Sequence, residues 1–281
     1  MVFLKKFNIL LLFLMIPKVF AAELFMTAIP NDDKNILEYR FNQVADYLTG
    51  VLAVEVIYTP VNSYVEAVDL FKEDQVQLAW FGGLSGVQAR RAVPGSEAIA
   101  QGLDDQFFRS YFIANASADI LPSKSFPNLN GFTFTFGSPD STSGRLMPQF
   151  FIERNLGKAP HDVFRRVGFT KNHLETIEKV QSGLYQVGAV DYKVWERAVS
   201  NGIVDFEKVS VIWESPSFPD TQWTVRADVD QQFGLGFKQK LQQALLNMRS
   251  SESESRLLYV PVEDHDYQPI EDVARAIGLI D

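Results

Sequence analysis

Three consecutive hydroxyl side chains, Ser141-Thr142-Ser143, are the residues of this chain best suited to bind an anion. They follow an alternating run at 132–136 that predicts a strand, and they precede apolar residues whose spacing predicts a helix over 145–156. The hydroxyls therefore fall at a helix start, where unpaired backbone N–H groups and the helix dipole attract anions. Ser and Thr are also favoured as ordinary N-caps, so the motif alone leaves both interpretations open.

Two further polar residues could act with this motif. His173 follows a predicted strand and could donate a ring N–H to an anion, although it could equally be a surface histidine. Asp220 follows a proline, as turn residues often do, and its carboxylate would repel an anion unless a proton or a cation lies between them. An unpaired Asp220 favours a protonated oxyanion, whereas an ion pair with His173 makes selenate acceptable.

Signatures of catalysis are missing from the sequence. There is no cysteine, no G-x-S-x-G nucleophile motif and no glycine-rich dinucleotide turn after a strand. His161 and His173 lack the neighbouring carboxylates or thiolates that a metal site needs. We therefore expect no catalytic residues, no metal and no cofactor.

The N-terminal residues have the layout of a secretory signal peptide. Lys5 and Lys6 precede an apolar run at 7–16, and Val19-Phe20-Ala21 forms a small-residue cleavage site. The run is shorter than the roughly 20 residues that span a bilayer. No later stretch predicts a membrane span, and the lack of cysteine excludes a lipid-modified N-terminal cysteine. We expect residues 1–21 to be removed and the protein to be released without a membrane anchor.

Removal of residues 1–21 makes the chain more acidic. Lys5, Lys6 and Lys18 are lost, which leaves 23 cationic and 35 acidic side chains and a net charge of −12. This charge argues against nucleic acid or an anionic membrane as a partner, because their phosphates would be repelled. It does not exclude a small anion held inside the protein by hydroxyls and backbone dipoles.

Strands and helices alternate along the mature chain, which is typical of an α/β fold with a parallel sheet covered on both faces. Strands are expected at 24–29, 54–58, 76–81, 132–136, 164–169, 187–190, 209–213 and 223–225, and helices at 36–48, 64–71, 145–156, 173–182, 192–199, 237–248 and 270–277. Val65, Val68 and Phe71 are expected to form one side of the second helix, and Gly50 to follow the first.

Two such series fit two lobes. The aperiodic residues 115–130, rich in Ser, Asn, Ala and Pro, are the best candidate for a connection between them. We expect one lobe over 22–112 together with 227–281, and the other over 113–226. In open α/β sheets ligands bind beyond the carboxyl ends of strands, where Gly82-Gly83, the three hydroxyls and His173 all fall.

At this point the order of motifs resembles the phosphate/phosphite/phosphonate ABC-transporter periplasmic binding proteins. Within that family, the run from Phe136 to Pro148 is similar to the branch of selenate-transporter binding proteins. The similarity covers nearly the whole mature chain, and the order of the motifs is more specific than any one of them. The motifs are Leu78-Ala79-Trp80-Phe81-Gly82-Gly83, Ser141-Thr142-Ser143-Gly144, His173, Gly188-Ala189-Val190-Asp191 and the segment from Pro216 to Asp220.

The resemblance implies a bilobed α/β periplasmic binding protein of type II, with two crossings between the lobes and the ligand in the cleft. It implies that Ser141, Thr142 and Ser143 hold an oxyanion. Further contacts are expected from Tyr64, Phe81, Gly82, His173 and Asp220. One departure is Phe108, which stands where phosphonate binders tend to have a tyrosine.

The function implied by the resemblance is capture of a small tetrahedral oxyanion in the periplasm and delivery to an ABC permease in the inner membrane. We expect the protein to act as a monomer. One alternative is a sensor subunit that presents its ligand-bound form to a membrane histidine kinase. An enzyme built on the same bilobed fold is a further alternative, although no catalytic motif favours it.

Overall fold

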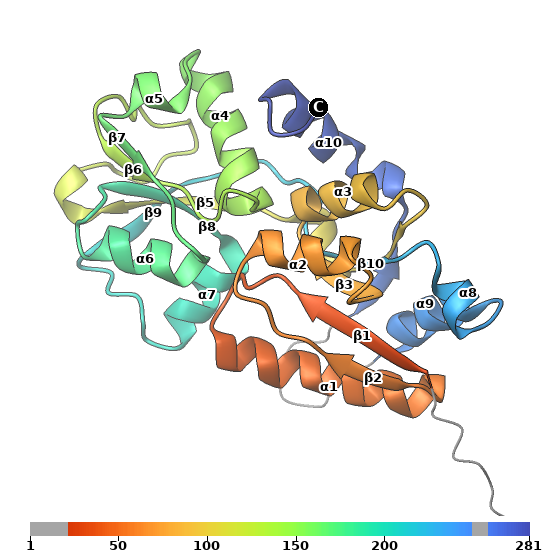
Figure 1. Cartoon of the computed structure of the whole chain (residues 1–281). Helices are drawn as coiled ribbons and strands as arrows, with labels where there is room; N and C mark the ends of the chain where they lie inside the picture. The colour runs from red at the N-terminus through yellow and green to blue at the C-terminus, as the bar shows by residue number, and fades with distance from the viewer. Residues whose placement is uncertain (1–21, 249–257) are drawn as a thin grey trace, which may run out of the picture.

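Two sheets organise the residues that the structure, a computed structural model, describes, which are 22–248 and 258–281 (Figure 1). The signal peptide expected at 1–21 lies outside them. The first sheet has the order β11 (Tyr259–Pro261), β4 (Glu97–Gly102), β10 (Gln222–Val225), β3 (Leu78–Phe81), β1 (Glu23–Ala28) and β2 (Glu55–Tyr58). The second has the order β7 (Arg166–Gly168), β6 (Thr133–Thr135), β8 (Val187–Asp191), β5 (Ser110–Asn115) and β9 (Val209–Glu214).

Helices flank each sheet, and several begin at a side chain that caps them. Asp33, Ser63, Asn172 and Asp191 each accept hydrogen bonds from backbone N–H groups in the first turn of the helix that follows. The first lobe contains α1 (Lys34–Leu52), α2 (Tyr64–Lys72), α3 (Gly83–Ala92), α8 (Val229–Phe233), α9 (Phe237–Asn247) and α10 (Gln268–Ala276). The second contains α4 (Met147–Leu156), α5 (Pro160–Val163), α6 (His173–Gln181) and α7 (Tyr192–Ser200).

The chain passes twice between the lobes, as the type II fold predicts. The first crossing joins β4 to β5 and includes the helical turn Leu103–Phe107, and the second joins β9 to β10. The two crossings pair side by side, because the backbone N–H of Phe108 donates to Phe218 O at 2.9 Å and that of Phe218 donates to Phe108 O at 3.0 Å. The two crossings are therefore held together by backbone hydrogen bonds.

The expected lobe boundaries need correction. A boundary at 112/113 would divide β5, which lies entirely in the second sheet, and one at 226/227 would assign β10 to the second lobe, although it lies in the first sheet. Residues 115–130 connect β5 to β6 within the second lobe rather than crossing between lobes. The polar composition of 115–130 suggested that this segment connects the lobes. The crossings instead pair through their backbones, at Phe108 and Phe218, and both of these aromatic side chains are buried.

Three other expectations also change. Both sheets are mixed rather than parallel, since β10 runs antiparallel to β3 and β4, and β5 to β8 and β9. Helix α1 continues through Gly50 and ends at Leu52. On α2 the buried face is Tyr64, Ala67 and Phe71, while Val65 is exposed.

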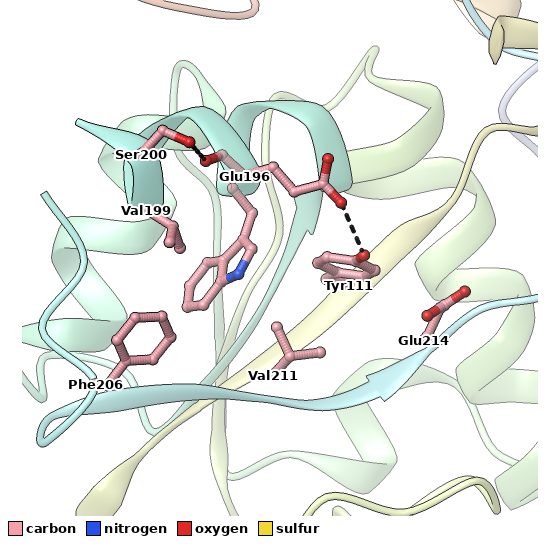
Figure 2. A pocket seen from close by; sticks show the side chains of 8 residues that line it. Tyr111, Glu196, Val199, Ser200, Phe206, Val211 and Glu214 are labelled. Atoms are coloured by element: carbon pink, nitrogen blue, oxygen red, sulfur yellow. Dashed lines mark hydrogen bonds between the residues drawn. The ribbon is translucent and has the colours of Figure 1, made fainter. Parts of the chain in front are cut away.

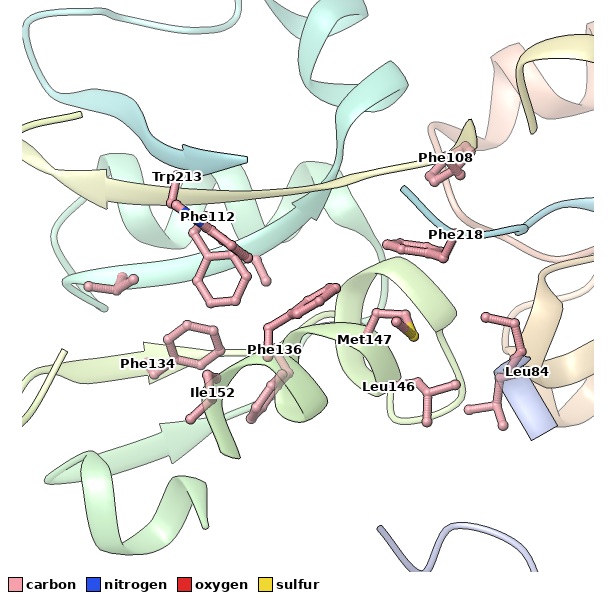
Figure 3. Close-up of a cluster of buried hydrophobic side chains, with 14 of the residues drawn as sticks. Leu84, Phe108, Phe112, Phe134, Phe136, Leu146, Met147, Ile152, Trp213 and Phe218 are labelled. Carbon is pink, nitrogen blue, oxygen red and sulfur yellow. The ribbon is translucent and has the colours of Figure 1, made fainter. Parts of the chain in front are cut away.

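Each lobe has its own aromatic core, and one core reaches the other lobe. In the first lobe Trp80 and Trp223 pack with ring centroids 5.2 Å apart. In the second, Phe112 and Trp213 pack at 5.2 Å, and their cluster extends to Leu84 on α3 of the first lobe (Figure 3). Apolar packing thus joins the lobes on one side of their interface.

The central strand β8 offers a test of how tightly the second lobe is packed. A Cβ at Gly188 would lie 2.8 Å from Val180 Cγ2 and 3.0 Å from Thr176 Cγ2. Gly188→Ala should therefore lower the free energy of unfolding by about 1–3 kcal/mol. In the matched control, Gly50→Ala, the new methyl meets nothing within 4 Å and should raise stability by about 0.5–1 kcal/mol. Urea denaturation measures both, and equal midpoints would contradict the packing described.

Candidate functional site

A small pocket lies between the lobes, with a cavity volume of about 10 Å³. The ends of strands and the starts of helices from both lobes meet there, as expected for open α/β sheets. Of the eight residues predicted for the site, seven line this pocket and one does not. The lining residues are Ile29, Asn31, Tyr64, Gly82, Ser141, Thr142, Ser143, His173, Asp191, Asp220 and Thr221.

Phe81 is the one predicted residue that does not line the pocket. Its side chain is fully buried in the first lobe and packs edge-to-face against Phe71 at 5.5 Å. As the last residue of β3 it precedes Gly82, and the alternation of a strand directs the two residues to opposite sides. Phe108 is likewise outside the pocket lining, and its ring packs against that of Tyr192 with centroids 4.9 Å apart.

The hydroxyl motif forms a π-helical turn, Thr142–Leu146, rather than the start of an ordinary α-helix. The N–H groups of Arg145 and Leu146 both donate to Ser141 O, at 3.1 and 3.0 Å. π-turns are rare and often occur at functional sites. Gly144 permits this turn, because a Cβ there would lie 2.9 Å from His173 Cε1. The N–H groups of Thr142 and Ser143 have no partner within the turn and lie beside the pocket, whereas that of Gly144 donates to Ser141 Oγ.

One of the three hydroxyls connects the lobes. Thr142 Oγ1 accepts a hydrogen bond from the backbone N–H of Leu84, at the start of α3, at 3.0 Å. Ser141 Oγ accepts from the Gly144 N–H at 2.9 Å, and Tyr64 of the first lobe lines the same pocket. Because the Thr142–Leu84 bond joins opposite walls of the pocket, the motif binds the other lobe as well as offering donors to a ligand.

Asp220 is buried at the start of α3. Its Oδ1 accepts from the Gly83 N–H at 2.9 Å. The pKa of Asp220 is raised to about 7, chiefly by burial, while the hydrogen bond from the Gly83 N–H acts to lower it. The nearby carboxylates of Asp191 and Asp105 raise this pKa further. Near neutral pH, a proton can therefore be gained or lost in the pocket.

His173 does not pair with Asp220. Its Nδ1 accepts from the backbone N–H of Asp191 at 3.2 Å, so the ring proton of the neutral form belongs on Nε2. Burial lowers the pKa of His173 and keeps the ring neutral, despite the carboxylate of Asp191 nearby. Of the two arrangements that the sequence left open, the structure has the unpaired Asp220.

The pocket lining thus contains two carboxylates, Asp191 and Asp220, and no lysine or arginine. Neutral donors, which are the π-turn N–H groups, the hydroxyls and the His173 ring, must hold any anion bound there. Asp191 belongs to a motif that the sequence singled out, but no role followed from it. Ile29, Asn31 and Thr221 were missed as well, and their places after β1 and before β10 were the only signal.

A larger hollow lies on the second lobe, between α7 and β9 (Figure 2). Tyr111, Trp195 and Phe206 line it, together with the carboxylates of Glu196 and Glu214. Its negative side chains and apolar walls are unsuited to an anion. No helix among the described residues has the length and apolar character to span a membrane. Within 22–248 and 258–281, no cluster of three or more His, Cys, Asp or Glu residues is arranged to hold a metal ion.

Two mixed sheets joined by paired crossings, with a polar pocket between them, define the two-lobed α/β fold of periplasmic binding proteins. The family model for the phosphonate ABC-transporter periplasmic substrate-binding proteins matches residues 26–273, and this chain belongs to that family. Its members are binding proteins and not enzymes, which confirms the prediction of no enzymatic activity.

Named relatives support the same assignment. The probable ABC transporter phosphite binding protein PhnD1 of Prochlorococcus marinus (strain MIT 9301) is 35% identical over 264 residues, which cover 90% of this chain and 89% of the relative. The structure of PhnD1 from that organism in complex with methylphosphonate has a TM-score of 0.86 at 33% identity, covering 92% of this chain and 99% of that one. A binding protein of an ABC phosphonate transporter from Pseudomonas aeruginosa shares the fold, with a TM-score of 0.77 at 19% identity and coverage of 90% and 85%. These relatives do not support the expected selenate branch.

The role of His173 as a neutral donor can be tested by substitution. His173→Phe removes the ring N–H and should weaken binding of methylphosphonate at least about tenfold, since a hydrogen bond to a charged group is worth about 1.5–3 kcal/mol. His173→Gln can place an amide N–H near the Nε2 position and should retain most of the affinity. Because the ring is neutral, the pH profile of His173→Gln should parallel that of wild type. Calorimetry would contradict this role if both variants bound equally well.

Proposed function

We propose that this chain captures a small tetrahedral oxyanion of the phosphite or phosphonate type and delivers it, as a monomer in the periplasm, to an ABC permease in the inner membrane. The observation that carries the proposal is the buried carboxyl of Asp220, which lines the pocket without a cationic partner. Such a group repels an anion unless one proton lies between the two.

The position of this proton distinguishes classes of anion. With a pKa of about 7, Asp220 carries a proton in about half of the molecules at neutral pH. Phosphite and phosphonates also exchange a proton near neutral pH, so the carboxyl and the ligand can share one proton supplied by either. Selenate and sulfate carry none, so the proton must come from Asp220 alone. This difference supports phosphite-type ligands over selenate, in agreement with the names of the relatives.

Contacts from both lobes support capture by closure. Tyr64 and Gly82 of the first lobe face Ser141 and His173 of the second across the pocket. A ligand between these walls would interact with both and would favour the arrangement in which the lobes touch, by a hinge motion at the paired crossings. Ser143 and the π-turn N–H groups would be the donors in the second lobe, with His173 beside them.

Asp220→Asn tests the proposal. The affinity of wild type for selenate should fall about tenfold per pH unit above about pH 7, because an acid whose folded-state pKa is raised loses its proton as the pH passes that value. Asp220→Asn should abolish this decline and bind selenate more tightly than wild type at about pH 8.5.

Calorimetric titration with phosphite, methylphosphonate, phosphate, selenate and sulfate measures these affinities. At neutral pH, wild type should prefer phosphite or methylphosphonate to selenate and sulfate. The matched control is Asp205→Asn, which changes a carboxylate that pairs with Lys208 within the second lobe. Tight, pH-independent binding of selenate by wild type would show that Asp220 does not act on the ligand.

A further inference from the structure

Helix α7 lines the pocket at its N-terminal end and, closer to its C-terminal end, bonds to the other lobe. Its N-cap, Asp191, lines the pocket, and Arg197 on the same helix bonds to Asp32 in the loop between β1 and α1 of the first lobe. Figure 1 shows α7 close to the start of α1. There the Nε of Arg197 donates to Asp32 Oδ2 at 2.9 Å, and a second guanidinium nitrogen bonds to the same oxygen. The two residues are 165 positions apart in the sequence, so this ion pair joins the lobes.

Asp32 links this ion pair to the pocket through its neighbour in the chain. Its side chain is only 4% exposed, and it directly follows Asn31, which lines the pocket. Within its own lobe, Asp32 accepts one hydrogen bond, from the N–H of Asp33 at 2.9 Å, while the Asn31 N–H donates to Ile29 O at 2.9 Å. The guanidinium of Arg197 is thus the cationic partner of a buried carboxylate one residue from the site.

We infer that Arg197 is a positioning residue, which through Asp32 holds Asn31 against the ligand and slows release of the anion. With the lobes in contact, loss of Arg197 would leave the carboxylate of Asp32 buried without a cation, an expensive arrangement. With the lobes apart, water can solvate both groups, so the ion pair favours only the closed arrangement. This inference rests on the proposed function, because it concerns release of the same anion.

A second cation on α7 has a different role. Lys193 pairs with Asp105, which lies in the first crossing rather than in the body of the first lobe. Because the crossings join the lobes covalently, that pair need not separate when the lobes open. The Arg197–Asp32 pair joins the bodies of the two lobes and must break on opening. This difference singles out Arg197 for the test.

The experiment compares Arg197→Met, Asp32→Asn, the double variant and Arg197→Lys in the full chain. Methionine keeps much of the apolar stem while removing the charge and the donors. Stopped-flow measurements use whichever of phosphite, methylphosphonate, phosphate, selenate and sulfate binds wild type most tightly, and these five anions are called the panel. Arg197→Met should raise the dissociation rate about tenfold and change the association rate less than about twofold, since loss of a buried charge partner acts mainly on dissociation. The double variant should release the anion no faster than Arg197→Met does. Arg197→Lys should have a dissociation rate between those of wild type and Arg197→Met.

A purely structural role would give a different pattern. The melting temperature without ligand should not change in Arg197→Met, because the pair is made only when the lobes close. Lys208→Met, which removes a pair within the second lobe, is the control and should leave the dissociation rate unchanged. This inference alone is overturned if Arg197→Met leaves the dissociation rate unchanged. It is also overturned if the melting temperature without ligand falls as much in Arg197→Met as the melting temperature with ligand. Failure of wild type to bind any panel anion overturns the proposed function and this inference together.

Discussion

The carboxylate of Asp220, at the start of α3, is the point on which the organisation of the site depends. It accepts from the Gly83 N–H of the first lobe and lines the pocket with Thr142 of the second, whose Oγ1 accepts from the Leu84 N–H. A helix N-terminus attracts negative charge, and here a buried carboxylate already supplies it. Any anion that enters the pocket must therefore share this electrostatic environment with Asp220, and protons become part of recognition.

This arrangement explains how so acidic a chain can be an anion receptor. The lining residues include no lysine or arginine, and His173 is kept neutral by burial, with Nδ1 engaged by the Asp191 N–H. The interactions that favour anion binding come from oriented N–H groups and hydroxyls, whose hydrogen bonds are stronger where water is excluded. The cost of two buried carboxylates then favours ligands that carry a proton. On this account selectivity arises from hydrogen bonding and proton sharing rather than from net positive charge.

Sequence patterns predicted the parts of the site that follow strand ends. The hydroxyl motif, His173 and Gly82 were found because small, polar or hydroxylated residues interrupt apolar runs there, and the order of motifs identified the family. The π-turn was not predictable, since it depends on the tertiary contact of Gly144 with His173. Phe81 was expected at the pocket because sequence position alone does not show which face of β3 it occupies. The lobe boundaries were wrong because β5 and β10 are apolar strands like any others, and only pairing reveals their sheets.

Proton uptake on binding tests the central claim most directly. Titration of wild type with phosphite at about pH 8, in buffers of different ionisation enthalpy, gives the number of protons taken up for each anion bound. Since Asp220 is largely ionised above its pKa of about 7, the account predicts an uptake approaching one proton, shared between the carboxyl and the ligand. Binding of phosphite at that pH with no exchange of protons would contradict it.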